Sequence, residues 1–338
     1  MRSTSEGVLS VVGNTPLVLL QRTYERTGSR LYAKLEGLNP GGSIKDRTAI
    51  SILKHGIETG AIHPWTVVIE SSSGNMGIGL AQACAFLKLR FICVVDPKTL
   101  SQNINILRTY GAEIDLVSQP DRESGEYLPA RIRRVRDLMT SVEHGFWSAQ
   151  YSNIYNAQAH HETMREIIAA LDTDLDYLFC STSTCGTLRG CAGYIREHKL
   201  RTKCIAVDAL GSAIFGGGKA KRLIPGHGAA VIPPLFQANL AERFLHVSDL
   251  DCIIGCRRLV REEAILAGGS SGGVFIAAEK AENFIEPGST CVAIFPDRGE
   301  RYLNTIYSDT WVREHFGDVE NGWLQAVPPN RELEFVSA

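Results

Sequence analysis

Lys45 is the side chain of this sequence best placed to form a covalent bond. It lies in the segment 39–47, where a turn rich in Gly and Pro delivers the lysine to the first turn of an expected helix. Lysine amines form Schiff bases with aldehydes, and a short rigid turn restricts where the aldehyde can lie. An ordinary surface lysine is the alternative, because lysine is mostly exposed. Three further segments favour the chemical role.

The segment 71–77 offers a site for an anion. Small residues, among them Ser72, Ser73, Asn75 and Met76, follow an expected strand and open an expected helix. The unpaired N–H groups and the positive end of a helix N-terminus suit a carboxylate or a phosphate. An ordinary serine N-cap is the alternative.

The segment 181–187 also follows an expected strand and opens an expected helix. Hydroxyl groups and flexible backbone at such a place can surround a phosphate without a metal ion or a lysine. A polar strand-to-helix connection is the alternative. The residues concerned are Ser183, Thr184, Cys185, Gly186 and Thr187.

The segment 267–273 carries four glycines around Ser270 and Ser271 and joins two expected helices. Backbone of this kind would let the chain approach a flat group. A free interdomain tether is the alternative, but the segment is too short and too closely bracketed by apolar helices for that role.

Two other phosphate-binding signatures fail. The segment 77–82 begins like a dinucleotide fingerprint, but Gln82 stands where the last glycine belongs, so the case for NAD is weak. The segment 213–220 resembles a P-loop, but Ala213 replaces its first glycine and Ala220 replaces the residue that would bind magnesium. We therefore exclude ATP hydrolysis.

The composition indicates a two-lobed protein that acts on small molecules. A chain of 338 residues with 44% hydrophobic content exceeds the size at which one core keeps growing, so a cleft between two lobes is expected. The net charge of −2 and the interspersed charges argue against a nucleic-acid partner. The start lacks the apolar core of a signal peptide, and no apolar run approaches the ~20 residues that span a bilayer. We expect no membrane association and a cytoplasmic location.

Neither the cysteines nor the histidines predict a metal site. There are nine cysteines, none of them in a C-x-x-C pair, and an odd number without an export signal fits reduced thiols in the core. The adjacent His160 and His161 are expected on a solvated helix face, because neighbouring helical residues cannot both point into one metal site.

Short β-branched segments alternate with longer amphipathic ones along most of the chain. The hydrophobic period switches between two and about 3.6 residues, which predicts an α/β fold with parallel sheets and helices on both faces. Ligands of such sheets bind beyond the carboxyl ends of the strands, where the glycine-rich segments lie. We expect strands at 31–36, 66–70, 91–95, 112–117, 177–180, 203–208 and 290–295, and helices at 47–59, 77–89, 101–110, 127–141, 187–199, 252–267 and 272–284.

Four ordered segments, 40–47, 72–77, 183–187 and 268–272, resemble those of the cysteine synthase and cystathionine β-synthase family, and the similarity runs from residue 13 to residue 302. Members of this family are fold-type II enzymes that depend on pyridoxal 5′-phosphate and have a fold like the tryptophan synthase β subunit. The resemblance implies two lobes, each with a largely parallel sheet flanked by helices, and a site in the cleft. The smaller, mobile lobe would comprise residues 1–12 and 35–149, the larger cofactor-phosphate lobe residues 13–34 and 150–330, and the tail residues 331–338.

The resemblance also implies how the cofactor would be held. Lys45 would form the Schiff base and, once freed, act as the base. Asn75 would hydrogen-bond the 3′ oxygen of the pyridine ring, and Ser270 would face the pyridine nitrogen. The phosphate would be held by Ser183, Thr184, Cys185, Gly186 and Thr187, although Cys185 departs from the small Gly or Thr usual at its position.

Within this family the sequence is most similar to the N-(2-amino-2-carboxyethyl)-L-glutamate synthases, in residues 127–131, 150–153, 297–302 and 307–311. These enzymes join O-phospho-L-serine and L-glutamate by β-replacement and release phosphate. Their product is a precursor of 2,3-diaminopropionate for siderophores and peptide antibiotics. The resemblance further implies a homodimer.

The substrate would then be held at both charged ends. Arg131 is the candidate for the leaving phosphate, because one guanidinium group can hold two phosphate oxygens, and a solvated arginine is the alternative. Tyr151 would line the same pocket or pack against it. The substrate carboxylate would contact Ser72, Ser73, the N–H of Met76 and Gln150.

Three other functions are compatible with parts of the sequence. The nearest is a cysteine synthase that uses sulfide with phosphoserine or acetylserine. Another is a catalytically silent pyridoxal-phosphate protein that regulates a partner, which the complete set Lys45, Asn75, Thr187 and Ser270 disfavours. The last, an NAD-dependent oxidoreductase, depends only on the alternating architecture, and a fold does not define a function.

Overall fold

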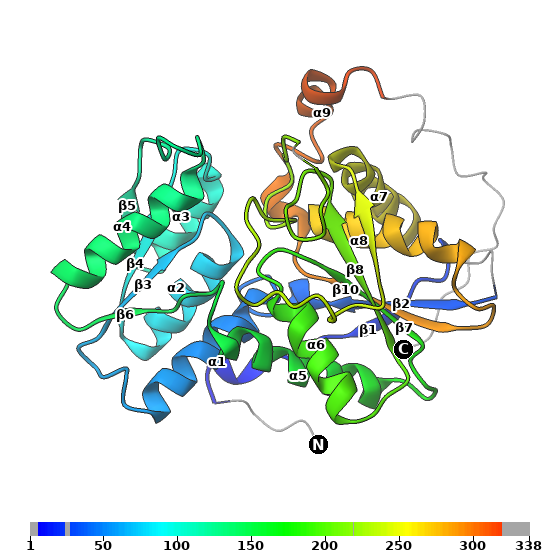
Figure 1. The fold of residues 1–338 in the computed structure, drawn as a ribbon, viewed down its shortest axis with the longest axis horizontal. Helices are drawn as coiled ribbons and strands as arrows, with labels where there is room; N and C mark the ends of the chain where they lie inside the picture. Colours follow the sequence, from blue (N-terminus) through cyan, green and yellow to red (C-terminus); the bar gives the residue numbers. More distant parts are fainter. Residues whose placement is uncertain (1–5, 24–27, 219, 320–338) are drawn as a thin grey trace.

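The computed structural model describes residues 6–23, 28–218 and 220–319. Two separate sheets form the framework of the protein, and helices lie on both sides of each (Figure 1). All pairs of neighbouring strands but one are parallel. The predicted α/β fold is therefore confirmed.

The first sheet has four strands in the order β5 (Glu113–Leu116), β4 (Arg90–Val95), β3 (Val67–Ser71) and β6 (Gly145–Trp147). Successive strand residues face opposite sides of a sheet. Val68 and Cys93 accordingly pack with the helices of one face, and Val67 and Ile92 pack with the helix of the other. The first face carries α1 (Lys45–Glu58), α2 (Asn75–Leu87) and α3 (Ser101–Thr109), and the second carries α4 (Tyr127–Ser141).

The second sheet has six strands in the order β1 (Leu17–Leu19), β2 (Arg30–Leu35), β10 (Thr290–Phe295), β7 (Tyr177–Ser181), β8 (Lys203–Ala209) and β9 (Arg243–Val247). Only β1 runs antiparallel to its neighbour. Leu178 and Val292 pack towards one pair of helices, and Phe179 and Ala293 towards the other. The pairs are α5 (Ile154–Ala170) with α6 (Gly186–Glu197), and α7 (Asp249–Glu263) with α8 (Gly269–Lys280).

The pairing of β2 with β10 decides where the Lys45 turn lies. The two strands are parallel, and Leu35 at the end of β2 faces Phe295 at the end of β10. The turn that leads to α1 and the segment that follows β10 therefore leave the sheet at the same edge.

The element boundaries agree closely with the prediction in some places and differ in others. α4 and β10 have the expected bounds, whereas α7 begins and ends earlier than the expected helix 252–267. Its start is fixed by a capping box of Ser248 and Asp251, and Ala264 ends it in a left-handed conformation. The strands β1, β6 and β9 were not predicted, and two of them have only three residues, too few to show a period. Of α5, only a helix at His160 and His161 was expected, without its bounds.

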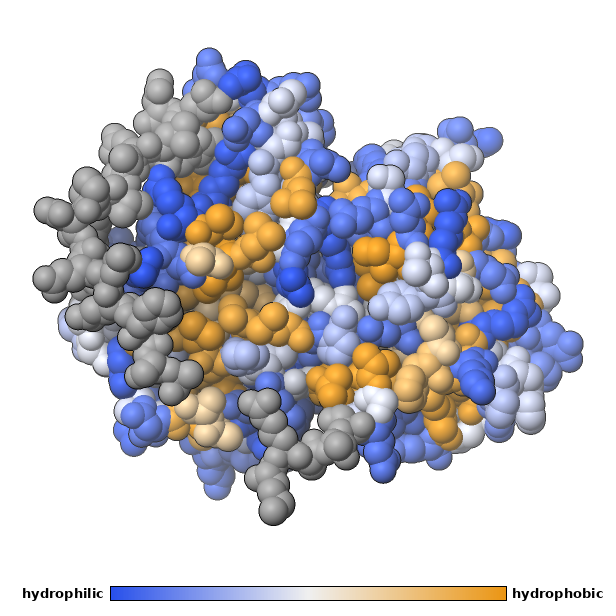
Figure 2. Space-filling model, turned by 180° about the vertical axis from the view of Figure 1, so that it is seen from behind, coloured by the Kyte–Doolittle hydropathy of each residue, from blue (hydrophilic) through white to orange (hydrophobic). Residues whose placement is uncertain are grey.

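None of the described helices is long and apolar enough to span a membrane. On the face opposite to that of Figure 1, hydrophobic patches are interrupted throughout by hydrophilic residues (Figure 2). This mixed surface agrees with the interspersed charges of the sequence.

Candidate active site

Lys45 is the first residue of α1, where the preceding turn meets the end of β10. The N–H of Ile44 donates to the carbonyl of Pro296 at 2.8 Å, and Ser43 faces Asp297 in an antiparallel bridge. Burial lowers the pKa of Lys45, and the negative charge of Asp297 partly offsets this effect. An amine whose pKa is lowered is a better nucleophile near neutral pH.

The connection from β3 to α2 lies at the carboxyl end of the four-stranded sheet. The N-cap residue of α2 is Gly74, and the hydroxyl of Ser72 accepts a hydrogen bond from the N–H of Gly77 in the first turn at 2.9 Å. The side chain of Asn103 donates to the carbonyl of Ser73 at 3.0 Å. The side chain of Met76 packs in the core, which leaves only its backbone for a ligand.

Glu70, the fourth residue of β3, is a buried carboxylate that sequence reasoning missed. It accepts hydrogen bonds from the N–H groups of Ser71 at 2.7 Å and Gln150 at 3.0 Å, and from the hydroxyl of Ser148. Burial raises the pKa of Glu70, and these hydrogen bonds oppose the rise. Glu70 thereby joins the end of β3 to Gln150, whose amide donates to the Ser71 carbonyl at 3.1 Å. A charged residue in an otherwise apolar strand was the signal for it.

Asp297 is a second buried carboxylate that was given no role. The amide of Asn75 donates to its Oδ2 at 2.8 Å, and the hydroxyl of Tyr302 donates to the same oxygen. Arg301 donates to the amide oxygen of Asn75 and to a carbonyl of the turn before α1. Burial raises the pKa of Asp297. The hydrogen bonds from Tyr302 and Asn75 and the charges of Arg301 and Lys45 oppose this rise. Lys45 and Asn75, distant in sequence, thus meet around one carboxylate.

The connection from β7 to α6 brings its hydroxyls to the N-terminus of a helix. α6 begins at Gly186, and the first N–H groups of a helix have no partner within it. The amide of Asn156 lies so close to Gly186 that a Cβ there would collide with it. This amide donates to the hydroxyl of Thr184 at 3.1 Å and to the carbonyl of Gln150 at 2.7 Å. Asn156 therefore links this loop to the Gln150 segment.

Cys185 precedes α6 in a left-handed conformation, with φ of 63°. Its side chain is 3% exposed and packs with Ile214, Ala229 and Leu235. Burial raises the pKa of the thiol to about 12. Because the thiol packs against apolar side chains, the backbone N–H group of Cys185 is the part that could donate a hydrogen bond to an anion.

His160 does not lie on a solvated helix face, and that expectation is wrong. The side chain is fully buried, because α6 packs on α5 at Gly190, where a Cβ would collide with the backbone of α5. Its Nε2 lies 3.3 Å from the hydroxyl of Thr187. Burial and the charge of Lys45 lower the pKa of His160 well below its usual value, so the imidazole is neutral. His161 is partly exposed, with a side-chain exposure of 39%.

The glycine-rich segment 267–273 is not an open loop between helices. α8 already begins at Gly269, and Ser270 is buried in its first turn. Gly255 and Gly272 face each other where α7 and α8 touch, and a Cβ on either would collide with the other helix. These two glycines serve helix packing. Gly268 lies against the Asp297 carboxylate, and Ala267 pairs with Arg298 in an antiparallel bridge, so this segment lies beside the residues that follow β10.

Arg131 on α4 is buried rather than solvated. Its side chain is 9% exposed, and its Nε lies 3.2 Å from a carboxylate oxygen of Asp96. Within the described residues, Nε and Nη1 nevertheless make no hydrogen bond. Burial raises the pKa of the Tyr151 phenol, whereas the charges of Arg131 and Arg222 lower it, so both guanidinium groups lie near this phenol. Arg222 was not predicted.

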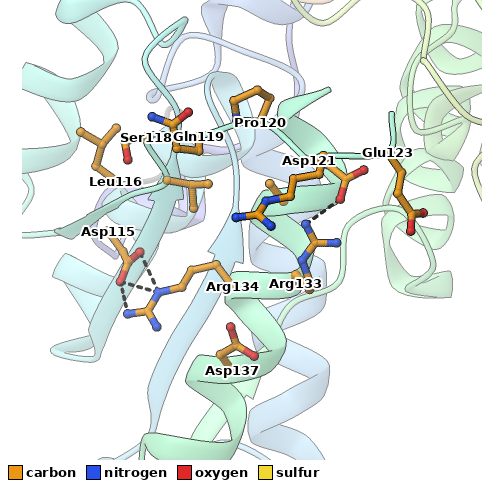
Figure 3. A pocket seen from close by; sticks show the side chains of 13 residues that line it. Asp115, Leu116, Ser118, Gln119, Pro120, Asp121, Glu123, Arg133, Arg134 and Asp137 are labelled. Atoms are coloured by element: carbon orange, nitrogen blue, oxygen red, sulfur yellow. Dashed lines mark hydrogen bonds and ion pairs between the residues drawn. The ribbon is translucent and has the colours of Figure 1, made fainter. Parts of the chain in front are cut away.

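A large cavity lies away from these residues. It has a volume of about 600 Å³ and opens between the end of β5 and α4 (Figure 3). Four of the charged side chains that line it form two ion pairs, Arg133 with Asp121 at 2.6 Å and Arg134 with Asp115 at 2.8 Å. A smaller hollow of about 100 Å³ is lined by Ser73, Asn103, Ile224 and Trp311, among others.

The residues around Lys45 fit a cofactor that carries an aldehyde and a phosphate. Lys45 supplies an amine of lowered pKa, and the loop before α6 supplies hydroxyls and helix N-terminal N–H groups. The buried Ser271 hydroxyl and Asp297 Oδ1 have no hydrogen-bond partner within the described chain. In the same residues no group of His, Cys, Asp or Glu side chains could hold a metal ion.

Comparison with known proteins identifies the cofactor. Residues 8–297 match the model of the family "Pyridoxal-phosphate dependent enzyme". The chain is 32% identical to the O-acetylserine dependent cystathionine beta-synthase from Helicobacter pylori, with 91% of this chain and 100% of that chain covered and a TM-score of 0.83.

Two further solved structures give the same result. Cysteine synthase from Entamoeba histolytica is 32% identical over 90% of this chain and 91% of that chain, with a TM-score of 0.84. O-ureido-L-serine synthase is 27% identical over 94% of this chain and 98% of that chain, also with a TM-score of 0.84. The chain therefore belongs to the family of pyridoxal-phosphate dependent enzymes, as a β-replacement enzyme related to cysteine synthase.

Proposed function

We propose that this enzyme joins O-phospho-L-serine to L-glutamate, giving N-(2-amino-2-carboxyethyl)-L-glutamate and phosphate. A phosphorylated donor substrate is supported by Arg131. Its guanidinium group is buried, and two of its nitrogens make no hydrogen bond within the described residues. Burying unpaired polar groups is costly unless a ligand pairs with them, and a phosphate is an anion whose oxygens a guanidinium group can bind in pairs. The glutamate acceptor is supported by the sequence resemblance alone.

The residues around the cofactor take separate roles in this proposal. Pyridoxal phosphate supplies the electron sink for the bond broken at the substrate Cα. Lys45 binds its aldehyde, Asn75 and Ser270 bind its ring, and the first turn of α6 binds its phosphate. The phosphate ligands are Ser183, Thr184, the N–H of Cys185, Gly186 and Thr187.

The donor substrate is held by the loops at the carboxyl end of the four-stranded sheet. Its carboxylate binds Ser72, Ser73, the N–H of Met76 and Gln150, and its phosphate binds Arg131 beside Tyr151. Holding both ends presents the Cα proton to the Lys45 amine, which removes it. The phosphate then leaves with the electrons of the Cβ–O bond. The acceptor amine forms the new bond to Cβ and gives up one proton, and the Lys45 ammonium returns a proton to Cα.

The product would serve as a precursor of 2,3-diaminopropionate for a siderophore or a peptide antibiotic. We also propose a homodimer, which light scattering of the purified enzyme would test. A monomeric mass would contradict this part without affecting the reaction.

The reaction is tested by mass analysis of products from O-phospho-L-serine with L-glutamate. We expect the joined amino acid and one phosphate for each molecule formed. Phosphate with pyruvate alone would mean that the donor is correct and that glutamate is not the acceptor. No phosphate release would overturn the phosphorylated donor.

A cysteine synthase is the second candidate function, because solved structures 32% identical to this chain include a cysteine synthase and a hydrogen sulfide-producing enzyme. Parallel incubations with sulfide, using either phosphoserine or O-acetylserine, separate the two functions. Faster formation of cysteine than of the joined amino acid would favour this candidate.

A further inference from the structure

Asp297 is a buried carboxylate near the reactive lysine, and it has no role in the reaction proposed above. It is 4% exposed and follows β10 by two residues. Its carbonyl accepts a hydrogen bond from the N–H of Gly268 at 3.0 Å, and its backbone pairs with Ser43 in the turn before Lys45. The backbone of Asp297 is therefore fixed on two sides, and its side chain cannot move far.

The two oxygens of this carboxylate have unequal surroundings. Oδ2 accepts hydrogen bonds from the Asn75 amide at 2.8 Å and from the Tyr302 hydroxyl. Oδ1 accepts none within the described residues. A buried carboxylate oxygen without a donor is unfavourable, so a nearby positive charge is the partner that this geometry lacks.

Two cations lie close enough to act on Asp297, namely Arg301 and Lys45. The Arg301 guanidinium is already bonded to Asn75 and to the Gly41 carbonyl. Lys45 makes no such bond with its amine within the described chain, and its charge is the one that changes during the reaction. The other titratable groups facing Asp297 are Tyr302 and, on the α7 side, Cys256 and Tyr307.

None of these titratable neighbours carries a negative charge that could balance a positive charge on the Lys45 amine. Burial raises the pKa of the Tyr302, Tyr307 and Cys256 groups, so all three are neutral at physiological pH. His160, whose pKa the charge of Lys45 helps to lower, is neutral as well. Asp297 is thus left as the carboxylate that can balance a positive charge on the Lys45 amine.

We propose that Asp297 is a positioning residue that holds the Lys45 ammonium while the lysine carries the substrate proton. The proton passes from the substrate Cα to the lone pair of the Lys45 amine, and the electrons of the C–H bond remain with the substrate. Asp297 takes up no proton, and its negative charge offsets the new positive charge. The inference depends on Lys45 as the reactive lysine, but not on the identity of donor or acceptor.

The experiment measures the Lys45 amine in the protein freed of cofactor. An amine-reactive reagent, trinitrobenzenesulfonate, is applied over a range of pH, and labelling of Lys45 is counted by peptide mass analysis. In Asp297→Asn we expect the midpoint of Lys45 labelling to fall by about one pH unit, because the charge of Asp297 favours the protonated form of the Lys45 amine and the substitution removes that charge. The exposed Lys88 in the same samples should keep its midpoint.

Glu300→Gln is the matched control, since Glu300 is a carboxylate three residues away that pairs with Arg298. It should leave the Lys45 midpoint unchanged. Asp297→Ser removes the same charge with a smaller side chain, and it serves if Asp297→Asn does not fold. An unchanged Lys45 midpoint in a folded Asp297 variant would overturn the proposal, as would an equal shift in Glu300→Gln.

Failure here is distinguishable from failure of the proposed reaction, because labelling uses neither substrate. In the loaded enzyme, Asp297→Asn should lower kcat and leave the KM for the donor nearly unchanged. A rise in KM with kcat unchanged would indicate a substrate-binding role and contradict the proposal. Borohydride reduction with pyridoxal phosphate, followed by peptide mapping, checks Lys45 itself as the attachment site.

Discussion

Arg47 on α1 and Glu166 on α5 form a buried, two-pronged ion pair. Nη1 and Nη2 of Arg47 lie 2.7 Å from Oε1 and Oε2 of Glu166, respectively. Glu36 accepts two further hydrogen bonds from the same guanidinium group, and the Lys34 ammonium lies 2.6 Å from Glu166. This network ties the helix that begins at Lys45 to β2 and α5 of the other sheet, so it fixes the position of the reactive lysine.

Glu166→Gln is expected to lower the free energy of unfolding by about 3–5 kcal/mol, because it leaves the buried Lys34 ammonium without its ion-pair partner and the buried Arg47 with Glu36 alone. Chemical denaturation of the variant and the parent measures this difference. Glu162→Gln is the control on the same helix, since Glu162 pairs with Arg165 at the surface. The control should change the free energy by no more than about 1 kcal/mol, and equal effects of the two substitutions would contradict the interpretation.

The Glu166 carboxylate should make the free energy of unfolding depend on pH in the acid range. Burial acts to raise the pKa of Glu166, but hydrogen bonds from Arg47 and Lys34 outweigh it and lower the pKa to about 2 from the usual 4.5. Burial lowers the pKa of Lys34 in spite of its ion pair, so the pair offsets only part of the cost of burying the ammonium.

Since the folded pKa of Glu166 is the lower one, its contribution is present above pH 4.5 and is lost as the pH falls towards 2. We expect the stability difference between parent and Glu166→Gln to shrink across this window. Denaturation curves at several pH values measure it. A difference that stays constant down to pH 2 would contradict the assignment.

The loops of the candidate site were predictable because each lies between a strand and a helix that the local sequence pattern indicates. The carboxyl ends of parallel strands share one edge of a sheet, so their order alone brings such loops together. Asp297 and Asn75 could not be paired in this way, since 222 residues separate them and they follow strands of different sheets. The pairing of β2 with β10 brings Asp297 beside the turn before α1, and the packing of α1 against α2 brings Asn75 to the same place. His160 was misjudged because its burial depends on α6, which packs against α5 at Gly190, and no local pattern reports that contact.

Arg131→Ala should impair the use of phosphoserine and leave the absorbance of the bound cofactor unchanged. Loss of a hydrogen-bonded charge pair costs about 1.5–3 kcal/mol, so kcat/KM for phosphoserine should fall roughly 10- to 100-fold. O-acetylserine carries no phosphate, and its kcat/KM should change little. Steady-state kinetics with both donors give the comparison.

The control for Arg131 is Arg133→Ala on the same helix. Arg133 is largely exposed and pairs with Asp121 at the rim of the large cavity (Figure 3). It should leave both donors unaffected. Should Arg131→Ala reduce the use of both donors equally, its guanidinium group would have a structural role and no phosphate-binding one.

The cysteines should resist alkylation in the folded protein. All nine are free and buried, and burial raises the pKa of Cys185 to about 12. The thiolate is the reactive form, so iodoacetamide at pH 8 should label none in the native protein and all nine after unfolding. Peptide mass analysis identifies each site. Native labelling at Cys185 would show that its thiol faces the cofactor site.

Gly272→Ala should destabilise the protein through the contact of α7 with α8. A Cβ at Gly272 would collide with the Cys252 carbonyl, and the two helices would have to move apart. Overpacking of this kind costs about 1–3 kcal/mol, which thermal and chemical denaturation can measure.

Gly193→Ala on α6 is the matched control for this helix contact. Its Cβ would meet only the tip of the partly exposed His161 ring, at 3.2 Å. Alanine is favoured over glycine inside a helix by about 0.5–1 kcal/mol, so this variant should equal or exceed the parent in stability. Equal stability of Gly272→Ala and Gly193→Ala would mean that the close approach of α7 and α8 does not require a glycine at position 272. Approach of the backbone to the cofactor would then be the better explanation for the glycines of segment 267–273.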